Sequence, residues 1–555
     1  MRKSGKKLLT AVMSVVMAGT MAFSAAGCGD NTPAGSDGEN VVDVKIMLAG
    51  YGTEWFKQAA KKFEQLYADK GYKINLAEES TTVSESVASE IQTPKTNGTD
   101  LYFVGSGSGG IDVSSLTKRS AAILRTNDRT LLENLNDVYS SPAISFDGKE
   151  ESVTIAEKMP DSEKPYFKFN GTGDAKLKKW EGNYYMFPWA SGPAGMYVNT
   201  AVLKAAGWDY IPRTTDEMLK LYKDMCPAAA DGVPTPVKTG VYPMTYAGKN
   251  AAGYWTYLWE TFYAQYSGYK ADRALWSLND TAKEDGYEVY NYEKDAGLLE
   301  SYKVMEKLTD EDYCAAGTAN LAMTAAQLNV LNGKAAYMVT GSWVNNEMKV
   351  NYADIADNMI FMRTPVISAL GAKLGITDEQ LASAVSGVDD GKTDAEIATE
   401  TGVTEEVAAR IREARGIYYS ASVNHVAAIP SYSPSKNVAK LFLRFLASDD
   451  NMDLYGSITS STLPFNYAGE SKITKNAFLK SAEDATKQSY SVMIADDFQA
   501  SPVRQIGMTI HCGYGTYSEV FLGLSQKTLT AQKIVEKNYT FAKSNWDTYI
   551  RQAGI

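Results

Sequence analysis

The sequence predicts an α/β protein whose first sheet is parallel. Segments typical of strands and of helices alternate over residues 41–51, 54–71, 72–79, 84–92 and 100–104. Such alternation builds parallel sheets with helices on their faces. Hydrophobic residues make up 44% of the chain and charged residues 22%, as in an ordinary globular protein. The length of 555 residues allows two or three domains with a large core.

The first strand and the first helix have the clearest patterns. Residues 41–51 are short and rich in β-branched side chains, which predicts a buried strand. Residues 54–71 place apolar side chains on one helical face, and Gly71 ends the segment. Ligands of parallel sheets bind outside the carboxyl ends of the strands. We therefore expect the loops at residues 50–54 and 105–110 to face a ligand.

The loop after the third strand has the sequence GSGSGG, residues 105–110, and a helical segment follows it. A strand, G-x-G-x-x-G and a helix form the arrangement that binds a dinucleotide pyrophosphate. That fingerprint normally follows the first strand of its sheet, whereas this one follows the third. We expect the glycines instead to allow close backbone approach to another ligand, with Ser106 and Ser108 as polar contacts beside Gly107.

The middle of the chain predicts further strand–helix units. Residues 183–208 combine a crossing segment with a strand and a helix, and residues 253–269 form an aromatic-rich helix. Residues 323–348 predict a helix, an Asn-Gly turn, a strand and a second helix. Two helices joined by a short loop end the chain, in residues 519–550.

The N-terminus has the three-part design of a secretory signal, because basic residues precede an apolar stretch and a small-residue segment. This segment, Ala-Ala-Gly, leads directly to Cys28 and resembles a bacterial lipobox, in which the cysteine becomes the acylated first residue. Residues 29–40 are polar and rich in Gly and Asp, as in a tether. We predict a signal peptide over residues 1–27 and a lipid-anchored tether over 28–40. A plain secreted protein with an unmodified Cys28 is the alternative.

Residues 363–417 predict a small helical insert of three short helices. The segment is rich in alanine, and Thr377 and Thr393 each begin a capping box. A third cap-like start is Thr404. Residues 394–415 look like a helix-turn-helix, but an exported, acidic chain does not meet DNA. We therefore interpret the insert as an accessory helical subdomain.

Charge and residue counts exclude several classes of function. The net charge of −11 disfavours nucleic acid, since phosphate binding requires an excess of Lys and Arg. Three cysteines follow Cys28: Cys226, Cys314 and Cys512. Their spacing fits no zinc or redox motif; at most one pair could form a disulfide, and the sequence leaves open which. The two histidines, His425 and His511, have no catalytic or metal-ligating spacing. We therefore predict no catalytic residue, no metal and no cofactor.

Four segments in one order carry a family resemblance. They are residues 41–76, Thr99-Asp100 before LYFV, residues 183–208 and LNGKAAYMVTGSWV, residues 331–344. Behind a lipobox, they resemble the extracellular solute-binding proteins of carbohydrate ABC transporters, the maltose-binding-protein-like group. The resemblance implies an α/β, periplasmic-binding-protein-like (class II) fold. Two α/β lobes with a hinge would close an interlobe cleft on a sugar, and the small helical insert departs from the basic pattern.

Mapped on that fold, residues 41–187 would start lobe one and residues 188–362 would build lobe two. After the insert at 363–417, residues 418–462 would return to lobe one. Residues 463–555 would return to lobe two.

A sugar site needs aromatic faces and planar hydrogen-bonding side chains. Trp343, in the Gly-x-Trp position, matches the stacking tryptophan of the family. The resemblance also points to the loops after the first and third strands, the crossing segment, the aromatic helix and a late segment. The expected sugar contacts are Trp343, Ser106, Gly107, Ser108, Glu54, Trp55, Trp189, Ser191, Tyr254, Trp255, Arg504 and Tyr514. Core packing is the alternative for the aromatic side chains, and Trp259 is expected in the core.

The resemblance implies a binding protein without catalysis that delivers a carbohydrate to an ABC permease. The count of 35 Tyr and 9 Trp favours an oligosaccharide as this carbohydrate. A monomer held on the extracytoplasmic face of the cell membrane by its lipid, as on a Gram-positive cell surface, is expected. An exported glycoside hydrolase and a non-transport sugar-sensing or adhesion lipoprotein are the alternatives. A hydrolase would require paired carboxylates, and no motif among the 66 acidic residues identifies such a pair.

Overall fold

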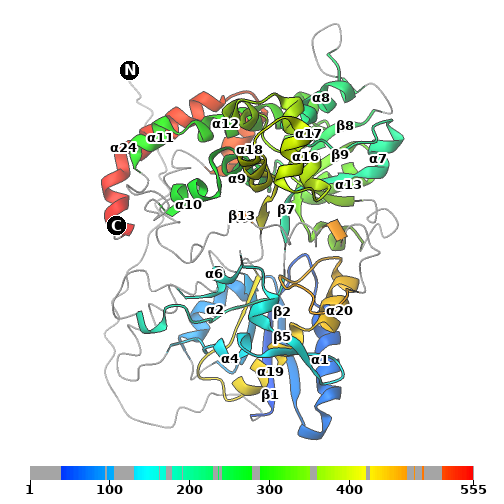
Figure 1. Ribbon diagram of the computed structural model, residues 1–555. Helices are drawn as coiled ribbons and strands as arrows, with labels where there is room; N and C mark the ends of the chain where they lie inside the picture. The colour runs from blue at the N-terminus through cyan, green and yellow to red at the C-terminus, as the bar shows by residue number, and fades with distance from the viewer. Residues whose placement is uncertain are drawn as a thin grey trace, which may run out of the picture. The chain divides into compact units, whose positions relative to one another are not determined.

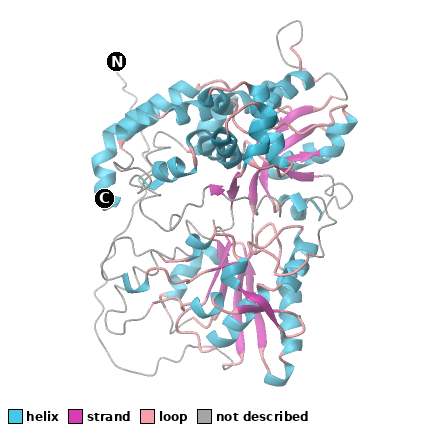
Figure 2. Cartoon of the chain, viewed as in Figure 1, coloured by secondary structure: helices cyan, strands magenta, loops and turns pink. Residues whose placement is uncertain are grey.

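Two lobes, each with its own sheet and apolar core, make up the part of the chain that the computed structural model describes. The described residues are 39–93, 97–105, 130–161, 163–169, 178–190, 192–228, 235–236, 240–277, 288–349, 359–420, 425–471, 480–481, 490–492 and 516–553. Helices flank the strands of each sheet (Figure 2). Among these residues, no helix combines the length and the apolar character needed to cross a bilayer.

The sheet of lobe one has the strand order β2-β1-β3-β12-β6. Its strands are β1 (Val41–Met47), β2 (Lys73–Ser80), β3 (Leu101–Gly105), β6 (Phe187–Pro188) and β12 (His425–Ala428). β1 pairs in parallel with β2 and β3, as the alternation of strands and helices predicts. β12 runs antiparallel to β3 and to β6, so the chain returns to this sheet after residue 420.

Helix α1 (Glu54–Leu66) is the amphipathic helix predicted after the first strand. Trp55, Phe56, Ala59 and Phe63 form its buried face. It packs beside α20 (Asp449–Thr459) and α19 (Lys436–Leu446) (Figure 1). The remaining elements of lobe one are η1 (Ala68–Lys70), α2 (Val83–Ile91), α4 (Asn136–Tyr139), β4 (Pro142–Ile144), β5 (Glu150–Thr154), α5 (Ile155–Lys158), α6 (Lys164–Phe167) and η2 (Lys178–Trp180).

The sheet of lobe two has the order β13-β11-β7-β9-β8, with β10 paired to β7. The strands are β7 (Pro193–Asn199), β8 (Tyr242–Thr245), β9 (Ala335–Gly341), β10 (Met359–Met362), β11 (Ile417–Ser420) and β13 (Tyr490–Val492). All seven residues of β7 and all seven of β9 are buried, as expected for central strands covered on both faces. β11 belongs to this sheet and β12 to the other, so one passage between lobes lies at residues 420–425.

Helix α9 (Thr256–Ser267) is the core helix of lobe two. Leu258, Trp259 and Phe262 are fully buried, which confirms the prediction for Trp259. It packs against α12 (Ala296–Leu308) and α10 (Tyr269–Ser277). The other helices of this lobe are α7 (Thr200–Ala205), α8 (Thr215–Met225), η3 (Ala252–Trp255), α11 (Val289–Lys294), η4 (Glu311–Tyr313), η5 (Thr318–Asn320), α13 (Met323–Leu331), α23 (Tyr517–Ser525) and α24 (Ala531–Ala553).

The predicted helical insert consists of α16 (Asp378–Asp389), α17 (Asp394–Thr401) and α18 (Glu405–Arg415), preceded by the short α15 (Ala369–Leu374). The capping boxes at Thr377 and Thr393 are confirmed, because each threonine accepts from the backbone N–H three residues on. α18 packs on α9, where Arg410 donates to the backbone oxygen of Gln265. The insert therefore covers the core helix of lobe two. The predicted boundaries between the lobes stay predictions.

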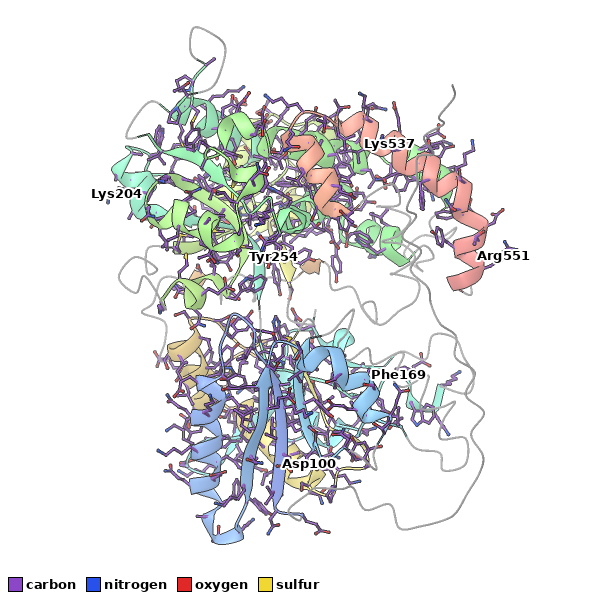
Figure 3. All side chains as sticks on the ribbon, turned by 180° about the vertical axis from the view of Figure 1, so that it is seen from behind. Asp100, Phe169, Lys204, Tyr254, Lys537 and Arg551 are labelled. Atoms are coloured by element: carbon purple, nitrogen blue, oxygen red, sulfur yellow. The ribbon has the colours of Figure 1, made fainter. Side chains whose placement is uncertain are left out.

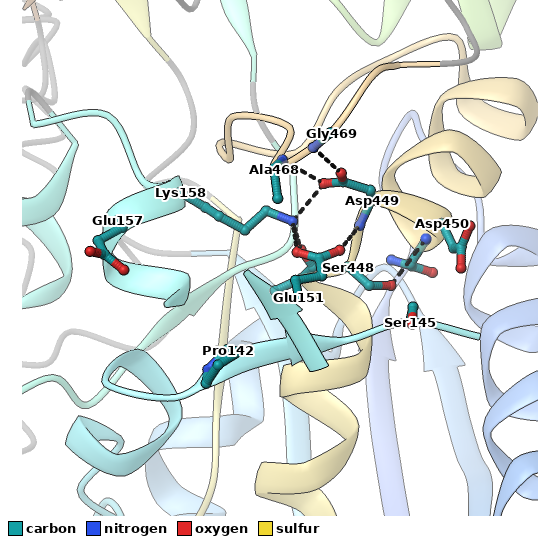
Figure 4. Close-up of polar contacts among 12 residues, drawn as sticks. Pro142, Ser145, Glu151, Glu157, Lys158, Ser448, Asp449, Asp450, Ala468 and Gly469 are labelled. Carbon is teal, nitrogen blue, oxygen red and sulfur yellow. Dashed lines mark hydrogen bonds and ion pairs between the residues drawn. The ribbon is translucent and has the colours of Figure 1, made fainter. Parts of the chain in front are cut away.

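A buried ion network stabilises lobe one (Figure 4). The side chain of Lys158 is fully buried, and its Nζ donates to Glu151 at 2.5 Å and to Asp449 at 2.7 Å. Asp449 also accepts from the backbone N–H groups of Ala468 and Gly469 at 3.0 and 2.7 Å. The network joins α5, the first turn of α20 and the segment that follows α20.

Candidate functional site

Trp343 lies directly after strand β9, where the chain turns into the helical residues 344–349. Gly341 ends the strand, and a Cβ there would lie 2.2 Å from the Trp343 ring. The absence of a side chain at Gly341 therefore allows the indole to fold back against the end of the strand. Trp343 is only partly buried, as a ligand-facing aromatic side chain must be.

Five aromatic side chains form one group around Trp343, which we call the junction cluster: Tyr51, Tyr254, Tyr257, Trp343 and Tyr419. The Trp343 ring lies 6.1 Å from Tyr254 and 6.4 Å from Tyr51, edge to face in both cases. Tyr257 lies 4.9 Å from Tyr254 and 4.5 Å from Tyr419. Two of the predicted contacts, Trp343 and Tyr254, are therefore neighbours. Figure 3 labels Tyr254 in lobe two.

Tyr51 is the contribution of lobe one to the junction cluster. It follows β1, and only 1% of it is exposed. Its ring lies 5.1 Å from His425, edge to face. Its hydroxyl faces Ser342 and Ser461, whose own hydroxyls are 2.9 Å apart. Burial raises the pKa of the Tyr51 phenol, so this side chain stays neutral at physiological pH.

Hydrogen bonds hold the two lobes together beside Trp343. The Nδ2 of Asn346 donates to the backbone oxygen of Gly50 at 2.6 Å. Lys349 donates to the hydroxyl of Ser460, a non-glycine residue with φ of 52°. A Cβ at Gly50 would lie 2.9 Å from the Trp343 Cβ, so glycine permits this close approach. The loop after the first strand therefore contacts lobe two.

The carboxylate of Glu347 affects two tyrosines of the cluster electrostatically, Tyr51 and Tyr254. It lies four residues after Trp343, and its Oε1 would lie 2.8 Å from a Cβ at Gly50. Its Oε2 accepts from Nε2 of Gln327 at 2.5 Å. Burial raises the pKa of Glu347, and its charge in turn helps to raise the pKa values of Tyr51 and Tyr254.

Three of the predicted aromatic contacts are buried in the lobe cores. Trp55 and Trp189 are each 1% exposed and stack on one another, with ring centroids 5.9 Å apart. Their Nε1 groups donate to the backbone oxygens of Gly52 and Val104. Trp255 is also 1% exposed and packs edge to face on Tyr246. In this structure these tryptophans support the loops that carry the cluster, and they present no open ring face.

Glu54 is exposed at the start of α1, where its Oε1 accepts from Gln58 at 2.9 Å. Among the described residues, no hydrogen bond or ion pair joins Glu54 to the junction cluster. Several other predicted residues lie outside the part of the chain that the structure describes. They are Cys28, Ser106, Gly107, Ser108, Ser191, Arg504 and Tyr514.

Four residues at this site are not among the predicted contacts: Tyr51, Tyr257, Tyr419 and Glu347. Tyr51 lies beside Gly50 in a loop that was expected to face the ligand, and Tyr257 is one helical turn from Tyr254. Both could have been found from these positions. Glu347 is one helical turn from Trp343 and could have been found in the same way, whereas Tyr419 carries no such signal, because only the packing of β11 brings it here.

Other candidate chemistry lies away from the cluster. A cavity of about 520 Å³ lies between α8 and η4 and is lined by Lys223, Lys307 and Tyr313, among others. Cys226 and Cys314 are unpaired and buried, and burial raises the pKa of Cys226 to about 12 and that of Cys314 well above its usual value. Within the described ranges, His, Cys, Asp and Glu side chains form no group of three or more that could hold a metal.

The fold agrees with the family match. The sequence model of the bacterial extracellular solute-binding protein family matches residues 146–453, more than half of the chain. The protein is a member of this family. Among curated proteins, no sequence matches the chain.

Three solved structures show the same architecture. The bacterial solute receptor AcbH, described as having an exclusive preference for β-D-galactopyranose, has a TM-score of 0.53 at 14% identity, covering 92% of this chain and 99% of its own. A chitin oligosaccharide binding protein has a TM-score of 0.55 at 14% identity, with 91% and 99% covered. The GacH receptor of Streptomyces glaucescens, solved with acarbose, has a TM-score of 0.52 at 11% identity, with 91% and 97% covered. These similarities confirm the two-lobed α/β fold.

Proposed function

We propose that this protein is a receptor that captures a carbohydrate at the junction cluster and delivers it to the permease of an ABC transporter. The observation that carries the proposal is the partly buried Trp343, grouped with Tyr254 and Tyr257 where the two lobes meet. Aromatic faces stack on the C–H patches of pyranose rings, and phenol hydroxyls bond to sugar hydroxyls. The three structural relatives named above bind a galactopyranose, chitin oligosaccharides and acarbose, which supports a carbohydrate ligand.

Binding would draw the lobes together. Tyr51 and Gly50 belong to lobe one, whereas Trp343, Asn346 and Tyr254 belong to lobe two. A ligand held between such groups favours the closed arrangement by its differential affinity for the two states. The permease would then recognise the closed surface.

Titration of the mature protein with a panel of oligosaccharides tests this function. We expect a saturable change in tryptophan fluorescence and no product. Trp343→Ala should weaken binding about thirtyfold, or about 2 kcal/mol, because the stacking face is lost. Trp180→Ala, a tryptophan of η2 far along the chain from the cluster, is the control and should bind as the wild type does. If the wild type hydrolysed the sugar, the receptor function would be refuted and the protein would be a hydrolase.

We also propose that Cys28 is acylated after removal of residues 1–27 and anchors the protein on the extracytoplasmic face of the membrane. The lipobox-like Ala-Ala-Gly-Cys sequence and the polar residues 29–40 support this anchor. Two acyl chains hold a protein stably, whereas one chain holds it only marginally. Cys28→Ala should move the protein from the membrane fraction to the soluble fraction of producing cells. Unchanged membrane retention would rule the anchor out.

A further inference from the structure

Glu347 is placed to touch whatever stacks on Trp343. The two residues are four apart in a segment whose residues 344–349 are helical, and such positions share one face of a helix. Both lie against the same point of lobe one. A Cβ at Gly50 would be 2.8 Å from the Oε1 of Glu347 and 2.9 Å from the Cβ of Trp343. The carboxylate therefore lies on the same side of lobe two as the Cβ of Trp343, where Gly50 of lobe one approaches both residues.

The carboxylate has unused capacity to accept hydrogen bonds. An ionised carboxylate accepts about four hydrogen bonds. Glu347 receives one within the described residues, from Gln327 on α13, and pairs with no Lys or Arg there. Lys349, two residues on, donates to Ser460 instead. A partly buried carboxylate without a cation opposes folding, and such groups concentrate at functional sites.

The surroundings of Glu347 define what it can accept. Burial raises the pKa of Glu347, and the phenols of Tyr51 and Tyr254 lie close enough to be affected by its charge. These phenols are neutral donors, and the aromatic faces beside them are electron-rich. Hydroxyl groups of a neutral sugar can donate to Oε1, which accepts no hydrogen bond from the described residues. A sugar carboxylate or phosphate would meet an acceptor that has no proton to give, and like charges repel at short range.

We propose that Glu347 is a specificity-determining residue that accepts hydroxyl hydrogen bonds from the sugar on Trp343 and selects neutral pyranosides over their uronic acid counterparts. This inference rests on the proposed carbohydrate function and assigns its substrate class. Hydrogen bonds to charged groups are about twice as strong as those between neutral groups, so the loss of charge weakens the contact. Glu347→Gln removes the charge and one of the two acceptor oxygens: the amide oxygen can still accept from Gln327, and the amide nitrogen then stands where Oε1 accepted.

The test measures calorimetric affinities for oligosaccharides in matched pairs, such as oligogalactosides and oligogalacturonates. The wild type should bind the neutral member at least tenfold more tightly. Glu347→Gln should bind the neutral sugar about tenfold more weakly. The ratio of its affinity for the neutral sugar to its affinity for the uronic acid should be smaller than in the wild type. Glu300→Gln, on α12 of the same lobe and paired with Lys303, is the matched control and should leave both affinities unchanged.

The outcomes separate this inference from the proposed function. If neutral sugars bind the wild type and Glu347→Gln binds them equally well, the role of Glu347 is refuted and the receptor function stands. Preference of the wild type for the uronic acids also refutes it. If no sugar binds the wild type, the carbohydrate function fails and the inference fails with it. Far-UV circular dichroism and thermal unfolding of each variant show that a lost affinity is not a lost fold.

Discussion

Two partly buried carboxylates of this protein, Asp449 and Glu347, have pKa values that are shifted in opposite directions. Asp449, in lobe one, accepts from the Lys158 ammonium and from the backbone N–H groups of Ala468 and Gly469. Burial alone would raise the pKa of Asp449, but these donors outweigh it, so the pKa is lowered. Glu347, at the lobe junction, accepts one side-chain bond from the described residues, that of the Gln327 amide, and burial raises its pKa.

The difference separates a structural carboxylate from one that a ligand can use. In the Lys158 network one buried ammonium bonds to two carboxylates inside lobe one, and Asp449 also accepts from the backbone of Gly469. Such a network stabilises the fold because each member satisfies the others. Glu347 keeps an acceptor open where two lobes meet. In the role that we propose for Glu347, a bound sugar supplies further donors to this carboxylate.

The largest expected effect comes from breaking the compensated network. Lys158→Ala leaves Glu151 and Asp449 without their cation, and their side chains are only 9% and 23% exposed. Removal of one partner from a buried ion pair costs about 3–5 kcal/mol. Urea unfolding followed by fluorescence should show a lower midpoint for Lys158→Ala. Lys149→Ala, which breaks the solvent-exposed pair with Asp147, should leave the midpoint unchanged. Equal midpoints for the two variants would contradict the buried role.

Much of the fold was predictable from local patterns. The strand–helix alternation predicts the parallel pairing of β1, β2 and β3, and the spacing of Thr377 and Thr393 predicts their capping boxes. These features depend on neighbouring residues in the chain. Lys158, by contrast, meets Asp449 from 291 positions away, and nothing near either residue indicates that contact.

The site was predictable only in part. Trp343 carries a motif, and Tyr254 begins an aromatic-rich helix, so both were identified from the sequence. Trp55 and Trp189 occupy equally suggestive positions, but their mutual stacking at 5.9 Å buries both rings in the core of lobe one. Sequence position shows that an aromatic side chain is near the carboxyl end of a strand. It does not show which way the ring turns, because that depends on tertiary packing.

The free energy of unfolding of Asp449→Asn, measured at several pH values, tests whether the charge of Asp449 stabilises lobe one. Asp449→Asn should lose about 2 kcal/mol at pH 7, because hydrogen bonds to a charged group are lost. A lowered pKa in the folded state means that the ionised form is stabilised above the usual value of 3.8, and that this stability is lost as pH falls through the folded value. Urea unfolding at several pH values should therefore show the wild type and Asp449→Asn converging below about pH 4. A gap that stays constant down to pH 2 would exclude this titration as its cause.

Replacing Gly50 with alanine tests whether sugar binding requires the close contact between the lobes at this residue. Gly50→Ala places a methyl group 2.8 Å from the Oε1 of Glu347 and 2.9 Å from the Cβ of Trp343, so the two lobes must separate slightly there. We expect about fivefold weaker sugar binding, or about 1 kcal/mol, with thermal unfolding unchanged. Leu48→Ala, two residues earlier and 40% exposed, is the control and should bind normally. Wild-type affinity in Gly50→Ala would show that binding does not require this contact.

The smallest expected effect is the change in stability of Glu347→Gln. Its sign is opposite to the one expected for Asp449→Asn in lobe one. Removing the charge of Asp449 destabilises the fold, whereas Glu347→Gln removes an uncompensated charge and keeps the bond to Gln327. The ligand-free variant should therefore be more stable than the wild type, by at most about 1 kcal/mol, while it binds sugar more weakly. Thermal unfolding without sugar and calorimetric titration with sugar measure the two quantities on one sample. A variant that loses stability and affinity together would place Glu347 with the structural carboxylates, because its charge would then be compensated within the protein.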